Sequence, residues 1–316
     1  MPEMFVDPEL RPLLAAMPEL ELNNDTLDAL RAAERAYPPV PQSATIKETR
    51  LIKGPDNSPD VNLVVYRPIS QAEARPCILH MHGGGYVLGA AEDMEFIHRP
   101  LSEDLDCVIV SVDYRLAPET VYPGALEDCY CALQWLHSNA IELGIDAGRI
   151  GVMGESAGGG LAAALALLAR DRGELKLSFQ HLVYPMIDDR TGTPSDAKKL
   201  VGPYTWNAAH NQFGWQALLG YEAGGDNVSP YAAAARETDL SGLPATYLAT
   251  STRDLFLEEN MDYAHRLMQA GVATELHVYP GGFHGFDILT KAAVAERALR
   301  DHKQALARAL SRQPDD

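Results

Sequence analysis

One serine of this chain lies in a setting typical of a nucleophile. Ser156 is the centre of a Gly-Glu-Ser-Ala-Gly run (154–158), which follows an apolar segment typical of a buried strand (149–153) and precedes an alanine-rich segment typical of a helix (160–170). In so tight a turn, side chains two residues before and after the serine would collide with the backbone, so glycine is needed at both places and the hydroxyl is exposed. A glycine-rich turn with a helix-capping serine has the same pattern, so the interpretation depends on partners elsewhere.

His284 is the histidine best placed to activate that serine. A serine hydroxyl is a weak nucleophile and needs a general base, itself oriented by a third group. His284 lies in a Gly-Gly-Phe-His-Gly-Phe run (281–286) after an alternating segment typical of a strand (273–279). A histidine in such a loop has little core to fill, which favours a chemical role. The histidines in strand, helix or inserted segments are interpreted as packing or surface residues: His181, His210, His265, His277 and His302.

The orienting acid is predicted to be Asp254. It comes soon after a short apolar run typical of a strand (244–251), and the interval to His284 leaves room for one helix and one strand, as in a β-α-β unit. Acids in the helix that follows are rivals, but acids near a first helical turn commonly stabilise the helix dipole and stay solvated. These rivals are Glu258, Glu259 and Asp262.

A run of three glycines supplies backbone N–H groups for a developing oxyanion. The strand-like segment 76–81 leads into His-Gly-Gly-Gly-Tyr (82–86), where consecutive glycines let successive N–H groups point the same way. Such donors are usually the largest single electrostatic contribution to acyl transfer. A flexible loop or a phosphate cradle would also use glycines, but the chain has neither Gly-Lys-Ser/Thr nor a Gly-x-Gly-x-x-Gly that leads into a helix.

Five short motifs together resemble one enzyme family. They are H-G-G-G-Y (82–86), D-Y-R-L-A-P-E (113–119), G-E-S-A-G-G (154–159), R-D-L-F-L-E-E (253–259) and F-H-G-F (283–286). In this order, from about residue 45 onward, they resemble the bacterial hormone-sensitive-lipase family of carboxylesterases, which are α/β-hydrolases. The resemblance implies a catalytic triad with Ser156 as nucleophile, His284 as base and Asp254 as acid. It implies an oxyanion hole made by the N–H groups of Gly84, Gly85 and Ala157.

Two positions depart from the family pattern. Leu255 and Phe256 follow the acid, where the family often has proline and leucine, and this bears on the local turn. Glu155 precedes the serine, where the family more commonly has Asp or Thr. The departure bears on any contact by which this side chain supports the serine.

Predicted strands and helices alternate along the chain, as an α/β fold requires. Strands are predicted at about 45–53, 61–67, 75–82, 106–113, 149–155, 179–184, 244–250 and 273–279, and helices near 92–105, 123–142, 158–171, 258–271 and 290–311. This order matches the α/β-hydrolase fold, with a mostly parallel eight-stranded sheet flanked by helices and a helical cap.

Two segments lie outside this alternation and are predicted to form the cap. They are residues 1–40 and an insertion at 188–227, and they leave 41–187 and 228–316 as the catalytic domain. An insertion after the sixth strand lies at the C-terminal edge of the sheet, where it would cover Ser156 and line an apolar pocket. Any one aromatic residue of the cap could instead fill a small second core. The predicted pocket residues of the insertion are Tyr204, Trp206, Phe213 and Trp215, and Tyr86, Leu255 and Phe286 are added because each adjoins one of the five motifs.

Composition fits a globular enzyme and excludes several other classes. The 316 residues are 46% hydrophobic and carry a formal net charge of −18 with no dense Lys/Arg cluster, which argues against a nucleic-acid or anionic-membrane partner. No apolar run has the length of a membrane span, and the first residues lack the features of a signal peptide, so a cytoplasmic enzyme is expected. The four cysteines lack metal-ligand spacing, and neither a metal nor a cofactor is expected.

These observations predict a cofactor-independent serine carboxylesterase. The family resemblance implies short- to medium-chain acyl esters as substrates and pairing into a homodimer through the last strand and its helix. The same triad would also serve an amide or lactone hydrolase or a deacetylase. A non-catalytic small-molecule receptor is a further alternative, and it is disfavoured because His284 is present.

Overall fold

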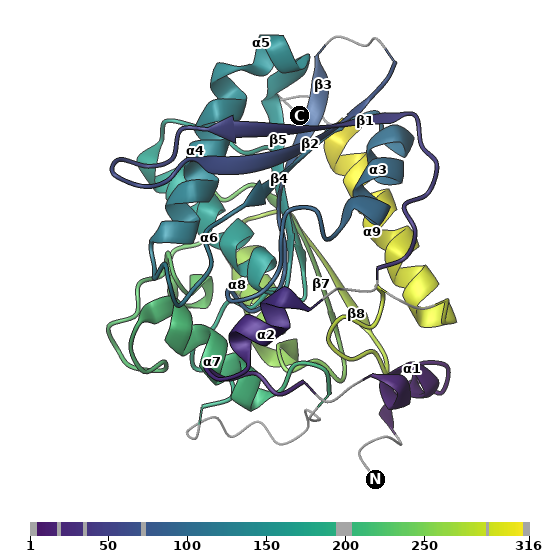
Figure 1. The fold of residues 1–316 in the computed structure, drawn as a ribbon, viewed down its shortest axis with the longest axis vertical. Helices are drawn as coiled ribbons and strands as arrows, with labels where there is room; N and C mark the ends of the chain where they lie inside the picture. Colours follow the sequence, from purple (N-terminus) through teal and green to yellow (C-terminus); the bar gives the residue numbers. More distant parts are fainter. Residues whose placement is uncertain are drawn as a thin grey trace.

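An eight-stranded sheet forms the centre of the molecule (Figure 1). A computed structural model describes residues 5–17, 20–33, 37–70, 74–193, 204–288 and 291–311. The strands are β1 (Thr45–Ile52), β2 (Val61–Pro68), β3 (Arg75–Met81), β4 (Val108–Asp113), β5 (Ile145–Glu155), β6 (Phe179–Val183), β7 (Ala245–Ser251) and β8 (Thr274–Tyr279). Their order in the sheet is β1-β2-β4-β3-β5-β6-β7-β8, with β2 antiparallel to β1 and β4 and the other pairs parallel. The predicted, mostly parallel sheet is confirmed.

Helices cover both faces of the sheet. On one face lie α4 (Gly124–Ser138), α6 (Ala157–Arg172) and α8 (Leu257–Gln269), and on the other lie α3 (Glu95–Asp104) and α9 (Ala293–Ser311) (Figure 1). The segment predicted as one helix, 123–142, is divided at Asn139 into α4 and α5 (Ala140–Leu143). Asn139 ends α4, and its Nδ2 donates to the Trp135 carbonyl at 2.8 Å. Among the described residues, no helix combines the length and the apolarity that crossing a bilayer requires.

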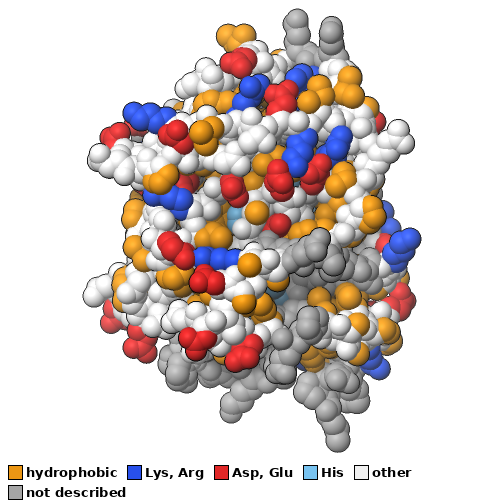
Figure 2. All heavy atoms as spheres, viewed as in Figure 1, with side chains coloured by type: hydrophobic (Ala, Val, Ile, Leu, Met, Phe, Trp, Pro, Cys, Tyr) orange, Lys and Arg blue, Asp and Glu red, His pale blue; other side chains and the backbone are white. Residues whose placement is uncertain are grey.

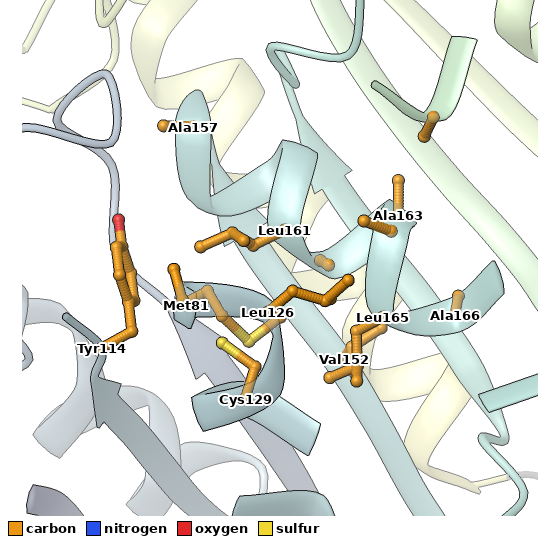
Figure 3. Close-up of a cluster of buried hydrophobic side chains, with 14 of the residues drawn as sticks. Met81, Tyr114, Leu126, Cys129, Val152, Ala157, Leu161, Ala163, Leu165 and Ala166 are labelled. Atoms are coloured by element: carbon orange, nitrogen blue, oxygen red, sulfur yellow. The ribbon is translucent and has the colours of Figure 1, made fainter. Parts of the chain in front are cut away.

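The packing of α6 on the sheet fixes the place of Ser156. Residues 157–169 of α6 are all buried, as expected for a helix that is enclosed by the sheet and by other helices. Leu161 and Leu165 of α6 belong to the same buried cluster as Val152 of β5 (Figure 3). Ser156 is the single residue between the end of β5 and the start of α6. It is therefore held at the carboxyl edge of the sheet.

Helices from the N-terminal and the inserted segment lie together at one end of the molecule (Figure 1). They are α1 (Arg11–Ala16), α2 (Leu27–Ala32) and α7 (Ala208–Leu219). His210 of α7 joins the two segments, because its Nε2 lies 2.8 Å from the carbonyl oxygen of Leu20. Parts of both predicted cap segments, residues 1–4, 18–19, 34–36 and 194–203, lie outside the described residues. The division into a cap of 1–40 and 188–227 and a catalytic domain stays a prediction.

The N-terminal segment is also bound to loops of the sheet's carboxyl edge. Asp7 donates its backbone N–H to Gly281 O at 3.0 Å, in the loop that carries His284. Arg31 of α2 donates to the carbonyl oxygens of Val87 and Ala117 at 2.8 and 2.6 Å. These contacts hold the segment against the loops that follow β3, β4 and β8.

Candidate active site

Ser156 lies at a backbone position that is strained for a residue with a side chain. Its φ is 56° and its ψ is −122°. A Cβ at Gly154 would lie 2.3 Å from the carbonyl group of Gly158, and one at Gly158 would lie 2.0 Å from Met81 O. Both glycines are therefore sterically required, as the sequence predicts. Strain of this kind is concentrated at functional sites.

His284 connects Ser156 to Asp254 through two hydrogen bonds. Its Nε2 lies 2.8 Å from Ser156 Oγ, and its Nδ1 lies 2.9 Å from Asp254 Oδ2. Asp254 is fully buried, and its Oδ1 accepts the backbone N–H of Phe256 at 2.9 Å. A carboxylate at Nδ1 fixes the tautomer in which Nε2 can accept the serine proton. The structure thus brings together the three side chains that the sequence analysis singles out.

The loops that carry the acid and the histidine are bound to each other. They follow β7 and β8, which are parallel neighbours, so Asp254 and His284 leave the sheet at the same edge. Arg253 N donates to Gly282 O at 2.9 Å across these loops. From the inserted segment, Thr205 Oγ1 donates to the backbone oxygen of His284 at 2.7 Å. The imidazole is therefore positioned by backbone contacts from two sides.

The glycine run after β3 lies against the serine. A Cβ at Gly83 would be 3.5 Å from Ser156 Cβ. Gly84 and Gly85 have φ angles of 123° and 61°, a region that favours glycine. In the described part of the chain, the N–H groups of Gly84, Gly85 and Ala157 donate to no protein acceptor. Unoccupied N–H donors beside a serine hydroxyl can bind an oxyanion.

A cavity of about 290 Å³ opens at Ser156. Both predicted cap segments contribute to its wall, since Tyr37 and Trp206 line it. Its described lining contains the carboxylates of Asp93 and Glu155 and neither Lys nor Arg. An anionic substrate would therefore meet no Lys or Arg side chain in this lining.

Of the seven predicted pocket residues, Trp206 lines this cavity and six do not. The six are largely packed into the interior: Tyr86, Tyr204, Phe213, Trp215, Leu255 and Phe286. The φ of Tyr86 is 67°, and its hydroxyl donates to Met186 O at 2.8 Å, which directs the ring inward. Trp215 packs against that ring, with centroids 5.3 Å apart. Neither a place in the inserted segment nor nearness to a motif in the sequence determines the direction of a side chain, so these six do not form the wall of the cavity.

Other side chains of the cavity were not predicted, and Tyr184 and Ile288 are the most informative. Tyr184 follows β6 as Ser156 follows β5, at the same edge of the sheet. That position after a parallel strand is the signal that could have found it. Ile288 follows His284 on the same loop, where the sequence offers no comparable signal.

Comparison with known proteins identifies the family. A family model described as an alpha/beta hydrolase fold matches residues 78–288, which include Ser156, Asp254 and His284. The chain belongs to the α/β-hydrolase family. Carboxylesterase NlhH of Mycobacterium tuberculosis is 34% identical to this hydrolase, and the match covers 95% of this chain and 96% of NlhH. The arylesterase of Saccharolobus solfataricus is 35% identical, and the match covers 76% of this chain and 78% of the arylesterase.

A solved structure extends the likeness to the whole fold. A structure described as a bacterial heroin esterase matches the hydrolase with a TM-score of 0.88 and 37% identity. The match covers 99% of this chain and 100% of the other. Together with the sequence relatives, it confirms that the hydrolase is of the bacterial hormone-sensitive-lipase type that its five motifs resemble.

Behind the serine, the hydrolase encloses an acid and a histidine in contact. Glu155 Oε2 lies 2.9 Å from His80 Nε2, and His80 Nδ1 lies 2.8 Å from Ser111 Oγ. Burial raises the pKa of Glu155 to about 7 and lowers the pKa of His80 to about 3. His80 is therefore neutral near pH 7 and bonds to Glu155 as an uncharged partner. The pair anchors the residue before the nucleophile to the neighbouring strand β3.

Proposed function

We propose that this serine carboxylesterase uses Ser156 as its nucleophile, His284 as its general base and acid, and Asp254 to orient the imidazole. One observation carries the proposal: the 2.8 Å contact between Ser156 Oγ and His284 Nε2, with a fully buried carboxylate 2.9 Å from Nδ1. A serine that only shaped a turn would need neither partner.

In the first half of the reaction, Ser156 Oγ attacks the carbonyl carbon of the ester while His284 Nε2 takes the hydroxyl proton. The carbonyl oxygen becomes negatively charged and accepts hydrogen bonds from the N–H groups of the oxyanion hole, which we assign to Gly84, Gly85 and Ala157. The bond from carbon to the alcohol oxygen then breaks. His284 gives its proton to the leaving alcohol, and the acyl group stays on the serine.

In the second half, a water molecule replaces the alcohol. His284 takes a proton from the water, and the resulting hydroxide attacks the acyl carbon through a second oxyanion. The bond to Ser156 Oγ breaks, and the proton returns from His284 to the serine. The Asp254 carboxylate stabilises the imidazolium that forms twice in the cycle.

We propose short- to medium-chain acyl esters as the substrates. The cavity volume of about 290 Å³ and the contribution of Tyr37 and Trp206 to its wall support a limited acyl group. An amide or lactone hydrolase or a deacetylase would use the same groups. The proposal therefore requires that p-nitrophenyl acetate be cleaved much faster than p-nitroacetanilide.

The experiment that tests the function is a profile of p-nitrophenyl esters of increasing acyl length, with labelling by a fluorophosphonate. We expect the highest kcat/KM at about two to eight acyl carbons, because the cap limits the room for a longer chain. The label should add its mass to the peptide that contains Ser156. Labelling of another serine, or an optimum at long chains, would contradict the proposal.

The proposal extends to location, assembly and partners. Four free cysteines, with Cys77 and Cys107 buried, support a reducing compartment such as the cytoplasm, which fractionation tests. The sheet ends at β8, and this edge strand supports a homodimer, which light scattering tests. Basic side chains are interspersed with acidic ones on the face seen in Figure 2, which argues against nucleic acid as a partner.

A further inference from the structure

A second cavity lies directly beside the catalytic one. Its volume is about 90 Å³. Four side chains line both cavities and form a shared wall, here called the partition: Met94, Glu155, Tyr184 and Ile288. The remaining lining of the second cavity is mixed. Its apolar members include Ile97, Met153, Val183 and Leu306, and its polar members are His98, His181, Asp287, His302 and Lys303.

The second cavity leads toward the surface between α3 and α9. A groove of about 500 Å³ on that surface shares five lining residues with the second cavity: Ile97, Leu101, Ile288, Leu299 and Lys303. The helices α3 and α9 lie on the same face of the sheet (Figure 1), and Lys303 pairs with Asp104 between them. The three hollows follow one another from Ser156 toward solvent. Ile288 borders all three.

The partition has two polar members and two apolar ones. Hydrogen bonds hold Glu155 to His80 and Tyr184 to Asp287. The apolar members, Met94 and Ile288, have no polar side-chain atoms, so packing alone holds their side chains. Shortening Ile288 would therefore join the first two cavities without breaking a hydrogen bond of the partition.

The partition lies on the side of the site where the leaving alcohol must be. The Tyr184 ring contacts the imidazole of His284, with centroids 4.8 Å apart, and Ile288 lies on the same loop as the histidine. His284 Nε2 has to reach the alcohol oxygen in order to protonate it. The carbonyl oxygen of the ester points instead toward Gly84 and Gly85. The alcohol half of the ester is thus the half next to the partition.

We propose that the partition closes the alcohol side of the site, that Ile288 thereby sets how long the alcohol can be, and that the second cavity receives the far end of a longer alcohol when the Ile288 side chain is shortened. The inference rests on the proposed function, because the proton transfer from His284 defines the alcohol side. The apolar part of the lining, which includes Ile97, Met153 and Val183, favours an unbranched alkyl alcohol. Each methylene that enters raises kcat/KM about fourfold, which corresponds to the ~0.8 kcal/mol of burying one CH₂ group.

Two series of esters test the proposal. One holds the acyl group as acetate and lengthens the alcohol from ethanol to octanol, and the other holds the alcohol as ethanol and lengthens the acid from acetate to octanoate. In Ile288→Ala, the best alcohol should become longer by about two carbons or more, since removing the side chain opens the partition. The profile of the acyl series should stay within about twofold of that of the wild type, because the acyl half points elsewhere.

Two further variants control the experiment. Leu299 borders the second cavity and is 40% exposed on α9, so Leu299→Trp can narrow the path from the surface side without a change in the buried core. Added to Ile288→Ala, it should reverse the gain for the longest alcohols. Ile141→Ala is the matched control, because Ile141 is 98% exposed on α5, and it should change neither series.

The outcomes separate this inference from the proposed function. A longer acyl optimum with an unchanged alcohol series would overturn it, and so would two unchanged series or a gain that Leu299→Trp leaves intact. Ile288→Val removes a single methylene and should shift the alcohol series slightly in the same direction, even where Ile288→Ala folds poorly. Ethyl acetate is the common reference substrate. Its hydrolysis by Ser156→Ala would instead refute the proposed function.

Discussion

Tyr184 lies against the imidazole of His284, with the ring centroids 4.8 Å apart and the ring planes at 63°. The same tyrosine donates its hydroxyl to Asp287 Oδ1 at 3.0 Å. Asp287 belongs to the loop of the histidine and is buried. Tyr184 therefore has two separable roles: its ring supports the imidazole, and its hydroxyl binds the loop that carries it.

The variant Tyr184→Phe separates these roles. It keeps the ring contact and removes one donor from buried Asp287, which is expected to lower the free energy of unfolding by about 1–3 kcal/mol. Turnover at saturating substrate should stay within about threefold of wild type, since the imidazole keeps its support. Thermal unfolding measures the loss of stability, and kcat at saturating substrate measures the effect on turnover. A large loss of kcat at unchanged stability would show that the hydroxyl, rather than the ring, acts on the reaction.

The variant Ser156→Ala removes the Oγ atom and almost no core volume. We expect ester hydrolysis to fall by at least ~10³-fold, because the covalent step is lost. Circular dichroism and the melting temperature should remain those of the wild type. Ser241→Ala is the control, since Ser241 is exposed and remote from the cavity. Activity within tenfold of wild type would refute the role of Ser156.

The variant Asp254→Asn tests the orienting acid. The amide cannot hold the imidazole in the same tautomer, so kcat should drop by roughly 10⁴-fold, as the corresponding change does in a serine protease. Glu258→Gln is a matched control, because Glu258 is an exposed acid at the start of α8. If the glutamine variant were the more damaged of the two, the acid would have to be reassigned to α8.

The pH dependence of stability should report on Glu155. Burial raises its pKa from 4.5 to about 7, so between these values the folded chain keeps a proton that the unfolded chain has lost. Its contribution to stability is full below about pH 4.5 and is lost as the pH rises through about 7. At 1.36 kcal/mol per pKa unit, the loss is about 3 kcal/mol.

Glu155→Gln isolates this effect, because the amide cannot lose a proton. The difference in melting temperature, wild type minus variant, should decrease steadily from pH 4.5 to pH 7.5, which thermal scans at each pH would measure. Two curves that run parallel over this range would mean that Glu155 titrates alike in the folded and unfolded chains.

The variant Arg31→Ala tests the attachment of the N-terminal segment. It removes bonds to the carbonyl oxygens of Val87 and Ala117 and an ion pair with Glu119. We expect KM to rise by about threefold to tenfold, because Tyr37, which comes after Arg31 in the sequence, lines the cavity. The change in kcat should be smaller, because Ser156, Asp254 and His284 lie on other segments of the chain. Arg50→Ala removes only a partly exposed ion pair and serves as the control. An unchanged KM would mean that the attachment does not shape the cavity.

The sheet and the positions of the three triad side chains follow from the sequence for the same reason. Each of Ser156, Asp254 and His284 follows a predicted strand, and parallel strands bring their carboxyl ends to one edge. Glycines around the serine and the histidine mark turns that only a few backbone geometries permit. Local sequence therefore determines where these three residues lie.

The wall of the cavity could not be predicted in the same way. Tyr86 adjoins the glycine run, yet its φ of 67° turns the ring inward, and no local pattern encodes that turn. Trp206 reaches the cavity because it packs over Gly85, where an added Cβ would lie 2.1 Å from its ring. Ile288 lines the second cavity and the surface groove together with residues of α3 and α9, and the sequence does not reveal this arrangement. Side-chain direction around the cavity depends on tertiary contacts.

The N-terminal segment leaves the ribosome before any of its partners exists. The bond from Arg31 to Ala117 can form only after a further 86 residues have been made. The bond between His210 and Leu20 needs 190 residues beyond Leu20. Asp7 binds to Gly281, beside the last of the three triad residues to be made. During synthesis, the segment cannot be fully attached beside Ser156 before the loop of His284 exists. The site is therefore completed and covered only after the loop that carries Gly281 and His284 has been made.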